Sequence, residues 1–130
     1  MRDVVADGAI LENAVLEGAD LRGANLSHIR AQGAIFGNAD LSNAYMDDSD
    51  LRRTVFHSGT LSHASLIQTN LAHASMAYMD LSGTIYTRMT GDSPFAADSE
   101  IGPTMECNHR DKQTQWPPPL PSWNHQNCDN

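Results

Sequence analysis

The chain has 130 residues, of which 40% are hydrophobic and only 6% aromatic, and it carries a formal net charge of −8 with a single lysine. This length suits one domain with an appended segment, and the core must be narrow because alanine supplies many of the hydrophobic residues. The acidic balance argues against a nucleic-acid partner, since binding to phosphates requires clustered lysine and arginine.

The N-terminal residues show no targeting segment. Residues 1–7 contain two acids and lack the apolar stretch of a secretory signal. No apolar run approaches the roughly 18 residues that a membrane span needs, so we expect no membrane partner. Both cysteines lie in the last quarter of the chain and are too few for a disulfide framework. We therefore expect a cytoplasmic protein.

From Ala9 to Tyr86 the sequence repeats with a period of five residues. Every fifth residue from Leu11 onward is large and apolar, with Ala31 as the one exception among sixteen units. The residue two positions earlier is nearly always small. The consensus is Ala-(Asp/Asn)-Leu-x-x, which is plainest in residues 19–23. Internal repetition of this kind predicts a solenoid.

A period of five is neither helical nor that of a simple strand. A helix turns by about 100° per residue, so a step of five would scatter the leucines over every face. A chain that points inward twice in five residues and then bends satisfies the pattern, and four such units close one four-sided coil. We call the leucine-type residue the central position, the residue two before it the small position, and the residue between them the outward position.

The pattern resembles the pentapeptide-repeat family over roughly the first two thirds of the chain. The resemblance implies an all-β fold, a right-handed quadrilateral β-helix with twenty residues per coil. Sixteen units then make about four coils, and the residues around Val4 and Ala6 begin a further one. We assign residues 1–88 to this β-helix and residues 89–130 to an irregular, proline-rich C-terminal cap and tail.

A circuit of twenty residues predicts that residues twenty positions apart stack on one another. One inner column then consists of four apolar residues: Leu16, Phe36, Phe56 and Met76. Its two phenylalanines should form an offset stack. Where one unit departs from the consensus, its total side-chain volume is conserved. Ala31 occupies the central position of that unit, and the larger Ile29 occupies its small position. Likewise, Gly59 lies one coil below the long Met79, as close packing requires.

The outward positions form columns along the rod, and two of them are candidate partner-binding surfaces. One is acidic at three of its four levels: Asp20, Asp40, Thr60 and Asp80. These side chains either imitate a phosphate backbone or hydrogen-bond the local backbone, and the second role is the commoner one for Asp. The other column is apolar at three levels and ends in serine: Val15, Ile35, Val55 and Ser75. We expect such an apolar strip to be covered from solvent by a second subunit, by a partner or by the C-terminal tail, and we prefer the tail.

The charged and titratable residues of the repeats indicate no catalytic or metal site. The repeats contain four histidines, none of them twenty residues from another: His28, His57, His63 and His73. We expect solvated histidines without a metal. Arg52 and Arg53 lie close in sequence to three aspartates, which indicates a salt-bridged edge. No Ser-His-Asp set and no phosphate-binding loop occurs, so we expect no catalytic residue and no cofactor.

After the repeats, glycine and proline disfavour a helix or a long strand. Solenoids need caps, and residues 114–117 resemble the Thr-x-Trp-Pro ending that follows the last coil in many pentapeptide proteins. We therefore expect residues 91–117 to form an irregular cap. Three apolar residues of this segment should be buried: Phe95, Ile101 and Trp116. The proline run at 117–121 fits a stiff tail better than a polyproline ligand.

The C-terminal segment also holds four potential zinc ligands: Cys107, His109, His125 and Cys128. The Cys-x-His spacing is tighter than in usual zinc knuckles. Free thiols are therefore the favoured interpretation, while a zinc site and a disulfide between the two cysteines stay open.

These observations favour a non-enzymatic interaction or scaffold protein that binds a protein partner, or itself as a homodimer, through flat solenoid faces. The resemblance implies one alternative, a DNA mimic that binds gyrase, as the quinolone-resistance pentapeptide proteins do. Residues 1–90 contain ten acids and six bases, a charge of −4, so the rod is less acidic than those mimics. A second alternative is a metal-dependent protein that uses the C-terminal Cys/His set.

Overall fold

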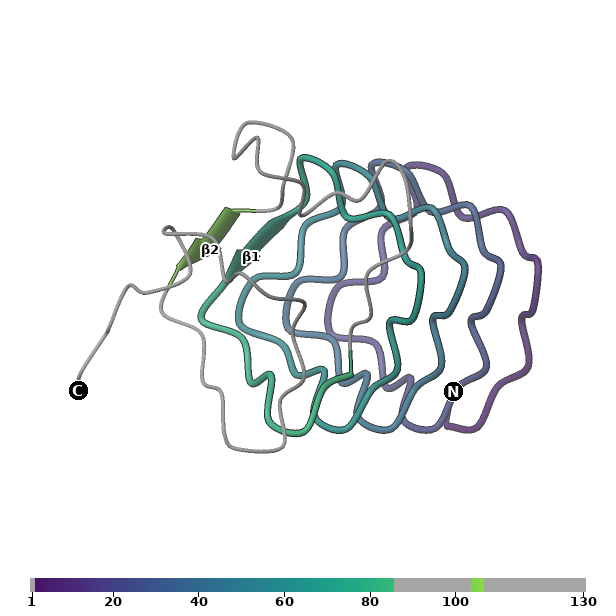
Figure 1. The fold of residues 1–130 in the computed structure, drawn as a ribbon, viewed down its shortest axis with the longest axis horizontal. Coiled ribbons are helices and arrows are strands. Elements are labelled where there is room, and N and C mark those ends of the chain that lie inside the picture. The colour runs from purple at the N-terminus through teal and green to yellow at the C-terminus, as the bar shows by residue number, and fades with distance from the viewer. Residues whose placement is uncertain (1, 86–103, 107–130) are drawn as a thin grey trace.

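The computed structural model describes residues 2–85 and 104–106, and the first of these ranges forms a four-sided solenoid (Figure 1). Parallel bridges join residues twenty positions apart, from Val5 with Asn25 to Ser65 with Ile85. One circuit therefore takes twenty residues, and the described range makes slightly more than four coils. The predicted repeat register is confirmed, as is the further coil that begins before the first full repeat.

Each side of a coil ends in a β-turn that starts at the central residue. Most of these turns are closed by a backbone hydrogen bond, for example from Ala14 N–H to Leu11 O at 3.0 Å. The third turn residue has positive φ throughout, and at twelve positions it is not glycine, including Asn13 (58°) and Tyr78 (58°). This is the backbone geometry of a type II turn. It bends the chain and leaves the last two residues of each repeat unit pointing outward.

Neighbouring coils are joined by hydrogen bonds that run along the solenoid axis. On one side, Leu16 N–H donates to Ile35 O at 2.7 Å, and Ile35 N–H donates to Ala14 O at 2.9 Å. The same pattern recurs on the other three sides. Four short parallel ladders therefore hold the coils in register.

The central and small positions fill the shaft of the solenoid. The Phe36 and Phe56 rings are fully buried and stacked, with 5.0 Å between their centroids and an interplanar angle of 7°, so the predicted stack is confirmed. Leu41 and Leu61 are also fully buried. The inner residues of the first coil are only partly buried: Val4, Ala6, Ala9, Leu11, Leu16 and Ala19.

Four small positions carry a hydroxyl in place of a methyl group: Ser49, Thr54, Thr69 and Thr84. Each hydroxyl donates to a backbone carbonyl beside the shaft. Thr69 Oγ1, for example, lies 2.7 Å from Met46 O. The buried oxygens are therefore satisfied, so they do not weaken the core as an unpaired polar group would.

The last described coil carries β1 (Ser75–Ala77), which pairs in parallel with β2 (Thr104–Glu106). This three-residue strand is the described part of the segment after residue 88, for which the sequence disfavours a helix or a long strand. An end coil presents unpaired backbone groups, which accept a parallel strand whatever its side-chain pattern.

β2 adjoins the edge of the fourth coil, with Thr104 as the register partner of Ser75, and so extends that side of the solenoid by one level (Figure 1). Thr104–Glu106 thus continue this side of the solenoid, and the predicted cover of the apolar strip by the rest of the tail falls on residues outside the described ranges. Three predicted cap residues lie outside the described residues: Phe95, Ile101 and Trp116. Across residues 2–85 and 104–106, no helix has the length and apolar character needed to cross a membrane.

Two glycines allow a matched test of the packing inside the coils. A Cβ on Gly59 would lie 2.6 Å from Ala39 O, whereas the nearest atom to a Cβ on Gly37 is 3.8 Å away. Neither has a positive φ. We expect Gly59→Ala to lower the free energy of unfolding by about 1–3 kcal/mol, because the backbone must shift. Gly37→Ala should be neutral or stabilising by up to about 1 kcal/mol.

Urea denaturation of the two variants beside the wild type gives both values. Similar stabilities for Gly59→Ala and Gly37→Ala would contradict the close backbone approach between the second and third coils.

Candidate functional site

One side of the solenoid carries a continuous apolar strip. This apolar face consists of residues 14–16, 34–36, 54–56 and 74–76, and bridges join its outward residues from Val15 through Ile35 and Val55 to Ser75. Val15 is 68% exposed and Ile35 37% exposed, while Val55 and Ser75 are half-buried. The predicted column is confirmed as a geometric feature, and its β-branched side chains form a flat surface.

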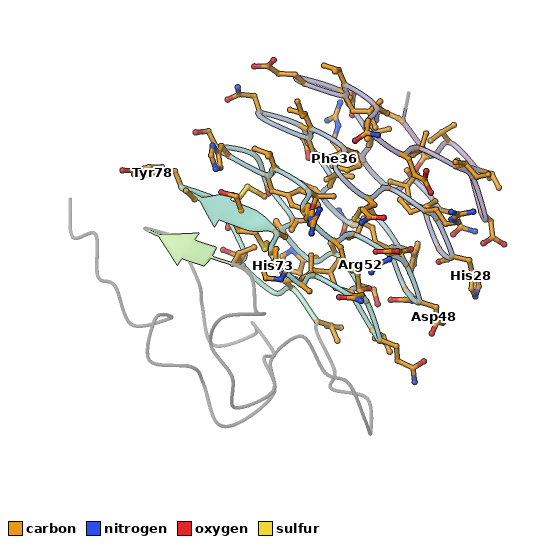
Figure 2. All side chains as sticks on the ribbon, turned by 90° about the horizontal axis from the view of Figure 1, so that it is seen from above. His28, Phe36, Asp48, Arg52, His73 and Tyr78 are labelled. Atoms are coloured by element: carbon orange, nitrogen blue, oxygen red, sulfur yellow. The ribbon has the colours of Figure 1, made fainter. Side chains whose placement is uncertain are left out.

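Two corners border the apolar face. The leading corner, before it in the chain, comprises residues 12–13, 32–33, 52–53 and 72–73. The trailing corner, after it, comprises residues 17–18, 37–38, 57–58 and 77–78. Figure 2 shows Tyr78 extending outward from the trailing corner. The leading corner contains a shallow hollow of about 210 Å³ lined by five residues: Glu12, Asn13, Gln32, Gly33 and Arg53.

The acidic column lies on the next side of the solenoid, and its carboxylates are engaged locally. Asp40 Oδ1 accepts hydrogen bonds from Ser42 N–H at 3.0 Å and from Ser42 Oγ at 2.6 Å. Asp80 does the same with Ser82, at 2.9 and 2.6 Å. In both cases the outward residue holds the turn that follows it. The predicted local role of these aspartates is confirmed at both levels.

Asp20 is engaged by an arginine instead. Arg22 Nε and Nη2 donate to its two carboxylate oxygens at 2.8 and 2.7 Å, and these bonds hold the pKa of Asp20 well below its ordinary value. Arg52 makes the same bidentate pair with Asp50, so the predicted salt-bridged edge is confirmed for Arg52, whereas no ion pair of the described residues includes Arg53. Both pairs are exposed on their arginine side, so each adds little to stability.

The preference for Asp or Asn at the outward position follows from this geometry. Asn25 Oδ1 accepts from Ser27 N–H at 3.1 Å, and Asn70 Oδ1 accepts from Ala72 N–H at 3.0 Å. A short side chain ending in oxygen reaches the N–H two residues later, which the turn leaves without a backbone acceptor nearby. The consensus residue at this position is therefore a structural device, and the acidic column is in large part its by-product.

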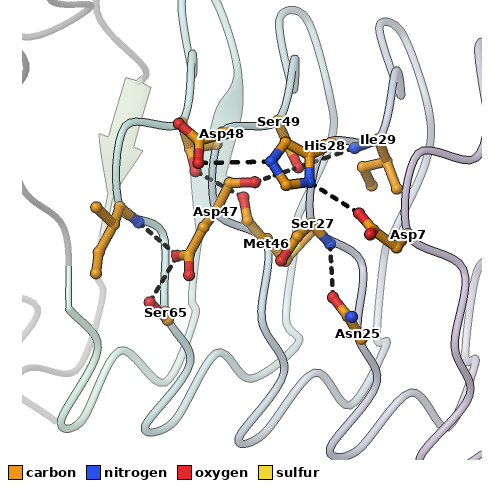
Figure 3. A network of polar contacts seen from close by, with 12 residues as sticks. Asp7, Asn25, Ser27, His28, Ile29, Met46, Asp47, Asp48, Ser49 and Ser65 are labelled. Carbon is orange, nitrogen blue, oxygen red and sulfur yellow. Dashed lines mark hydrogen bonds and ion pairs between the residues drawn. The ribbon is translucent and has the colours of Figure 1, made fainter.

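One histidine has carboxylate partners that were not predicted. His28 lies between carboxylates from the coils on either side, with Nδ1 2.8 Å from Asp7 Oδ1 and Nε2 3.8 Å from Asp48 Oδ2 (Figure 3). The hydrogen bond with Asp7 and the charges of Asp7, Asp48 and Asp47 raise its pKa above the ordinary 6.5. The expectation of a histidine that is merely solvated is therefore incomplete. The twenty-residue spacing between His28 and Asp48 is the sequence signal for this contact.

The remaining polar groups of this corner serve the backbone. Asp47 Oδ1 accepts from Ile67 N–H at 2.9 Å and from Ser65 Oγ at 2.6 Å (Figure 3). In the part of the chain that the structure describes, no group of three or more His, Cys, Asp or Glu side chains could hold a metal ion. The predicted zinc or disulfide residues all lie outside that part: Cys107, His109, His125 and Cys128.

Substitution of Asp40 tests its local role. Asp40→Ala removes the acceptor for the following turn and should cost about 0.5–1.5 kcal/mol of unfolding free energy. Asp40→Asn keeps an oxygen in place and should cost less than half as much. Denaturant unfolding measures both. If the two substitutions destabilise equally, the negative charge matters and the hydrogen bond does not.

Stability should also depend on pH through His28. Because its pKa is raised in the folded chain, its stabilising contribution is complete below about pH 6.5 and is lost as the pH rises through the raised value. Over that window the melting temperature of the wild type should fall more steeply than that of His28→Gln, at low salt. His73→Gln is the control and should keep the wild-type slope. Equal slopes for wild type and His28→Gln would show that the two aspartates do not couple to folding.

Comparisons with known proteins bear on the fold. The family model for pentapeptide repeats matches residues 1–38, 23–57, 34–70 and 49–85, with eight copies. A search of curated proteins found no match. The pentapeptide repeat protein Rfr23 from the cyanobacterium Cyanothece 51142 is 22% identical and has a TM-score of 0.56. The alignment covers 84% of this chain and 63% of Rfr23.

Two further crystal structures match less well. A pentapeptide repeat protein of the Arabidopsis thaliana thylakoid lumen is 24% identical, with 82% of this chain and 63% of that chain covered and a TM-score of 0.40. HetL from the cyanobacterium Nostoc, described as involved in heterocyst differentiation regulation, is 21% identical, with 82% and 51% covered and a TM-score of 0.33.

The chain thus spans less than two thirds of each of these three proteins, and at such identities the likeness to Rfr23 shows the fold alone. The family model covers more than half of the chain and coincides with the four-sided solenoid. The protein belongs to the pentapeptide repeat family, and its solenoid is a right-handed quadrilateral β-helix.

Proposed function

We propose that this pentapeptide repeat protein is a non-enzymatic interaction protein that binds another protein through its apolar face. The observation that carries the proposal is the column of β-branched residues in exact register on that face. Its first two members are substantially exposed, although no local turn requires an apolar side chain there. Contiguous exposed apolar surface of this kind marks protein-binding sites.

The filled shaft supports the same function. Phe36, Phe56 and the leucines around them are fully buried and occupy the interior themselves, so recognition falls to the outer faces. These faces are flat because their outward residues repeat at the spacing of β-strands, about 4.8 Å. A flat, regular surface suits contact with another protein surface.

The acidic column gives less support to the alternative of a DNA mimic that binds gyrase. A mimic must present its carboxylates to a partner. Here Asp40 and Asp80 accept bonds from their own turns, and Asp20 is paired with Arg22. The alternative of a metal-dependent protein rests on residues outside the described ranges, so no observation of the structure favours it.

A pair of matched triple variants tests the proposal. The first replaces three outward residues of the apolar face by serine: Val15, Ile35 and Val55. The control replaces three exposed apolar residues of the other sides by serine: Val5, Ile10 and Tyr45. Tagged chains are used to capture proteins from the source cells, with circular dichroism to show that both variants fold.

We expect the apolar-face variant to lose at least about nine tenths of the captured partner, because each side chain contributes apolar area that serine lacks. The control should retain the partner. Equal capture by both variants would rule out the apolar face as the binding surface.

A further inference from the structure

The charges that border the apolar face change sign along the solenoid axis. At the level of Val15, the leading corner carries Glu12 and the trailing corner carries Glu17. Two coils further on, at the level of Val55, the corresponding corners carry Arg53 and His57. The level between them is neutral, with glycine at both corners. The border is therefore acidic at both corners of the first level and positively charged at the leading corner of the third.

Much of this border charge is open to a partner. Within residues 2–85, neither Glu17 nor Arg53 takes part in an ion pair, and both side chains are exposed. Glu12 contacts Arg30, which belongs to the neighbouring side, through one carboxylate oxygen at 2.6 Å. A carboxylate can accept hydrogen bonds at both oxygens, so this contact leaves Glu12 able to pair with a second cation.

We infer that the apolar face binds a second copy of this chain in a two-fold dimer. The two-fold axis lies in the plane of the face, runs parallel to the strands and crosses the face at the level of Ile35. The inference rests on the proposed function and names its partner. The axis places the first level of one copy against the third level of the other, so Val15 meets Val55 and Ile35 meets its own equivalent. Every contact occurs twice, as in any isologous interface.

Charge complementarity selects this arrangement. The axis keeps the strands of the two copies parallel, so leading corners face leading corners. Glu12 then faces Arg53 of the second copy, and Glu17 faces His57 of the second copy. The other simple face-to-face dimer has its axis along the solenoid. It would set Glu12 against Glu17, which like-charge repulsion disfavours.

The size of the face sets the strength of the dimer. Three residues of strand across and the three overlapping levels along give roughly 140 Å² of flat area. Stable interfaces bury about 800 Å² per partner, so the self-association should be weak, with a Kd on the order of 100 µM. Such a dimer forms at high local concentration and is reversible.

Analytical ultracentrifugation of the full chain, from about 1 µM to 1 mM, tests the inference. The wild type should pass from monomer to dimer over this range. Arg53→Glu and Glu12→Arg should each weaken the dimer about tenfold or more, because each creates two like-charge contacts. Gln68→Glu is the matched control, because it adds an acid at the same turn position with positive φ, away from the apolar face. It should dimerise like the wild type.

Mixing the two charge variants gives the decisive measurement. In a heterodimer of Arg53→Glu with Glu12→Arg, both corner contacts again join opposite charges, so association should return to within about threefold of the wild type. The inference is overturned if the wild type stays monomeric at 1 mM, if Arg53→Glu dimerises normally, or if the mixture fails to associate.

The result is distinct from a failure of the proposed function. A monomeric wild type whose apolar-face serine variant still loses a captured protein would leave that function standing, with a different protein as the partner. A monomeric wild type with unchanged capture would remove both. If residues 107–130 cover the strip, the serine variant should instead release them to added protease, with no change of mass in the ultracentrifuge.

Discussion

The structure depends on the backbone hydrogen bonds that join each residue to residues one circuit away. Leu16 N–H to Ile35 O is one example, and the same bond recurs on every side. These bonds fix the register to the residue, so a side chain at any level must fit directly under the one twenty positions later. The narrow shaft then admits one large and one small residue per side. The five-residue sequence period and the surface columns are both consequences of this constraint.

The same register decides what each surface can do. On the acidic side, the outward residues are committed to holding turns, as Asp40 holds the turn at Ser42. On the apolar side, Val15 and Ile35 have no such task and remain available. Residues that hold turns and residues that are free of such a task thus lie on different faces of one simple repeat. In the proposed dimer, the border charges orient a face that would otherwise bind in either direction.

Most of this architecture could be predicted from the sequence. The sizes of the side chains reveal the five-residue period, the twenty-residue register of the coils and the stacking of the inner residues. The Phe36–Phe56 stack follows directly from twenty-residue spacing. β2 could not be predicted, because its pairing uses the free backbone of β1 and needs no side-chain pattern. The spacing does indicate one partner of His28, because Asp48 lies twenty residues later. The other partner, Asp7, lies twenty-one residues earlier, and its contact depends on how far the side chains reach between levels.

The corners are where this protein is most open to change. The leading corner places Asn13, Gly33, Arg53 and His73 in one column, all with φ between 58° and 74°. Asparagine, glycine, arginine and histidine therefore share one backbone conformation at this corner, although their side chains differ widely. For the three that are not glycine this conformation costs about 1 kcal/mol or somewhat more. None of these four residues enters the shaft, so a substitution at this corner does not disturb the packing of the core. Substitutions at these corners can therefore change the surface of the rod while its scaffold stays the same.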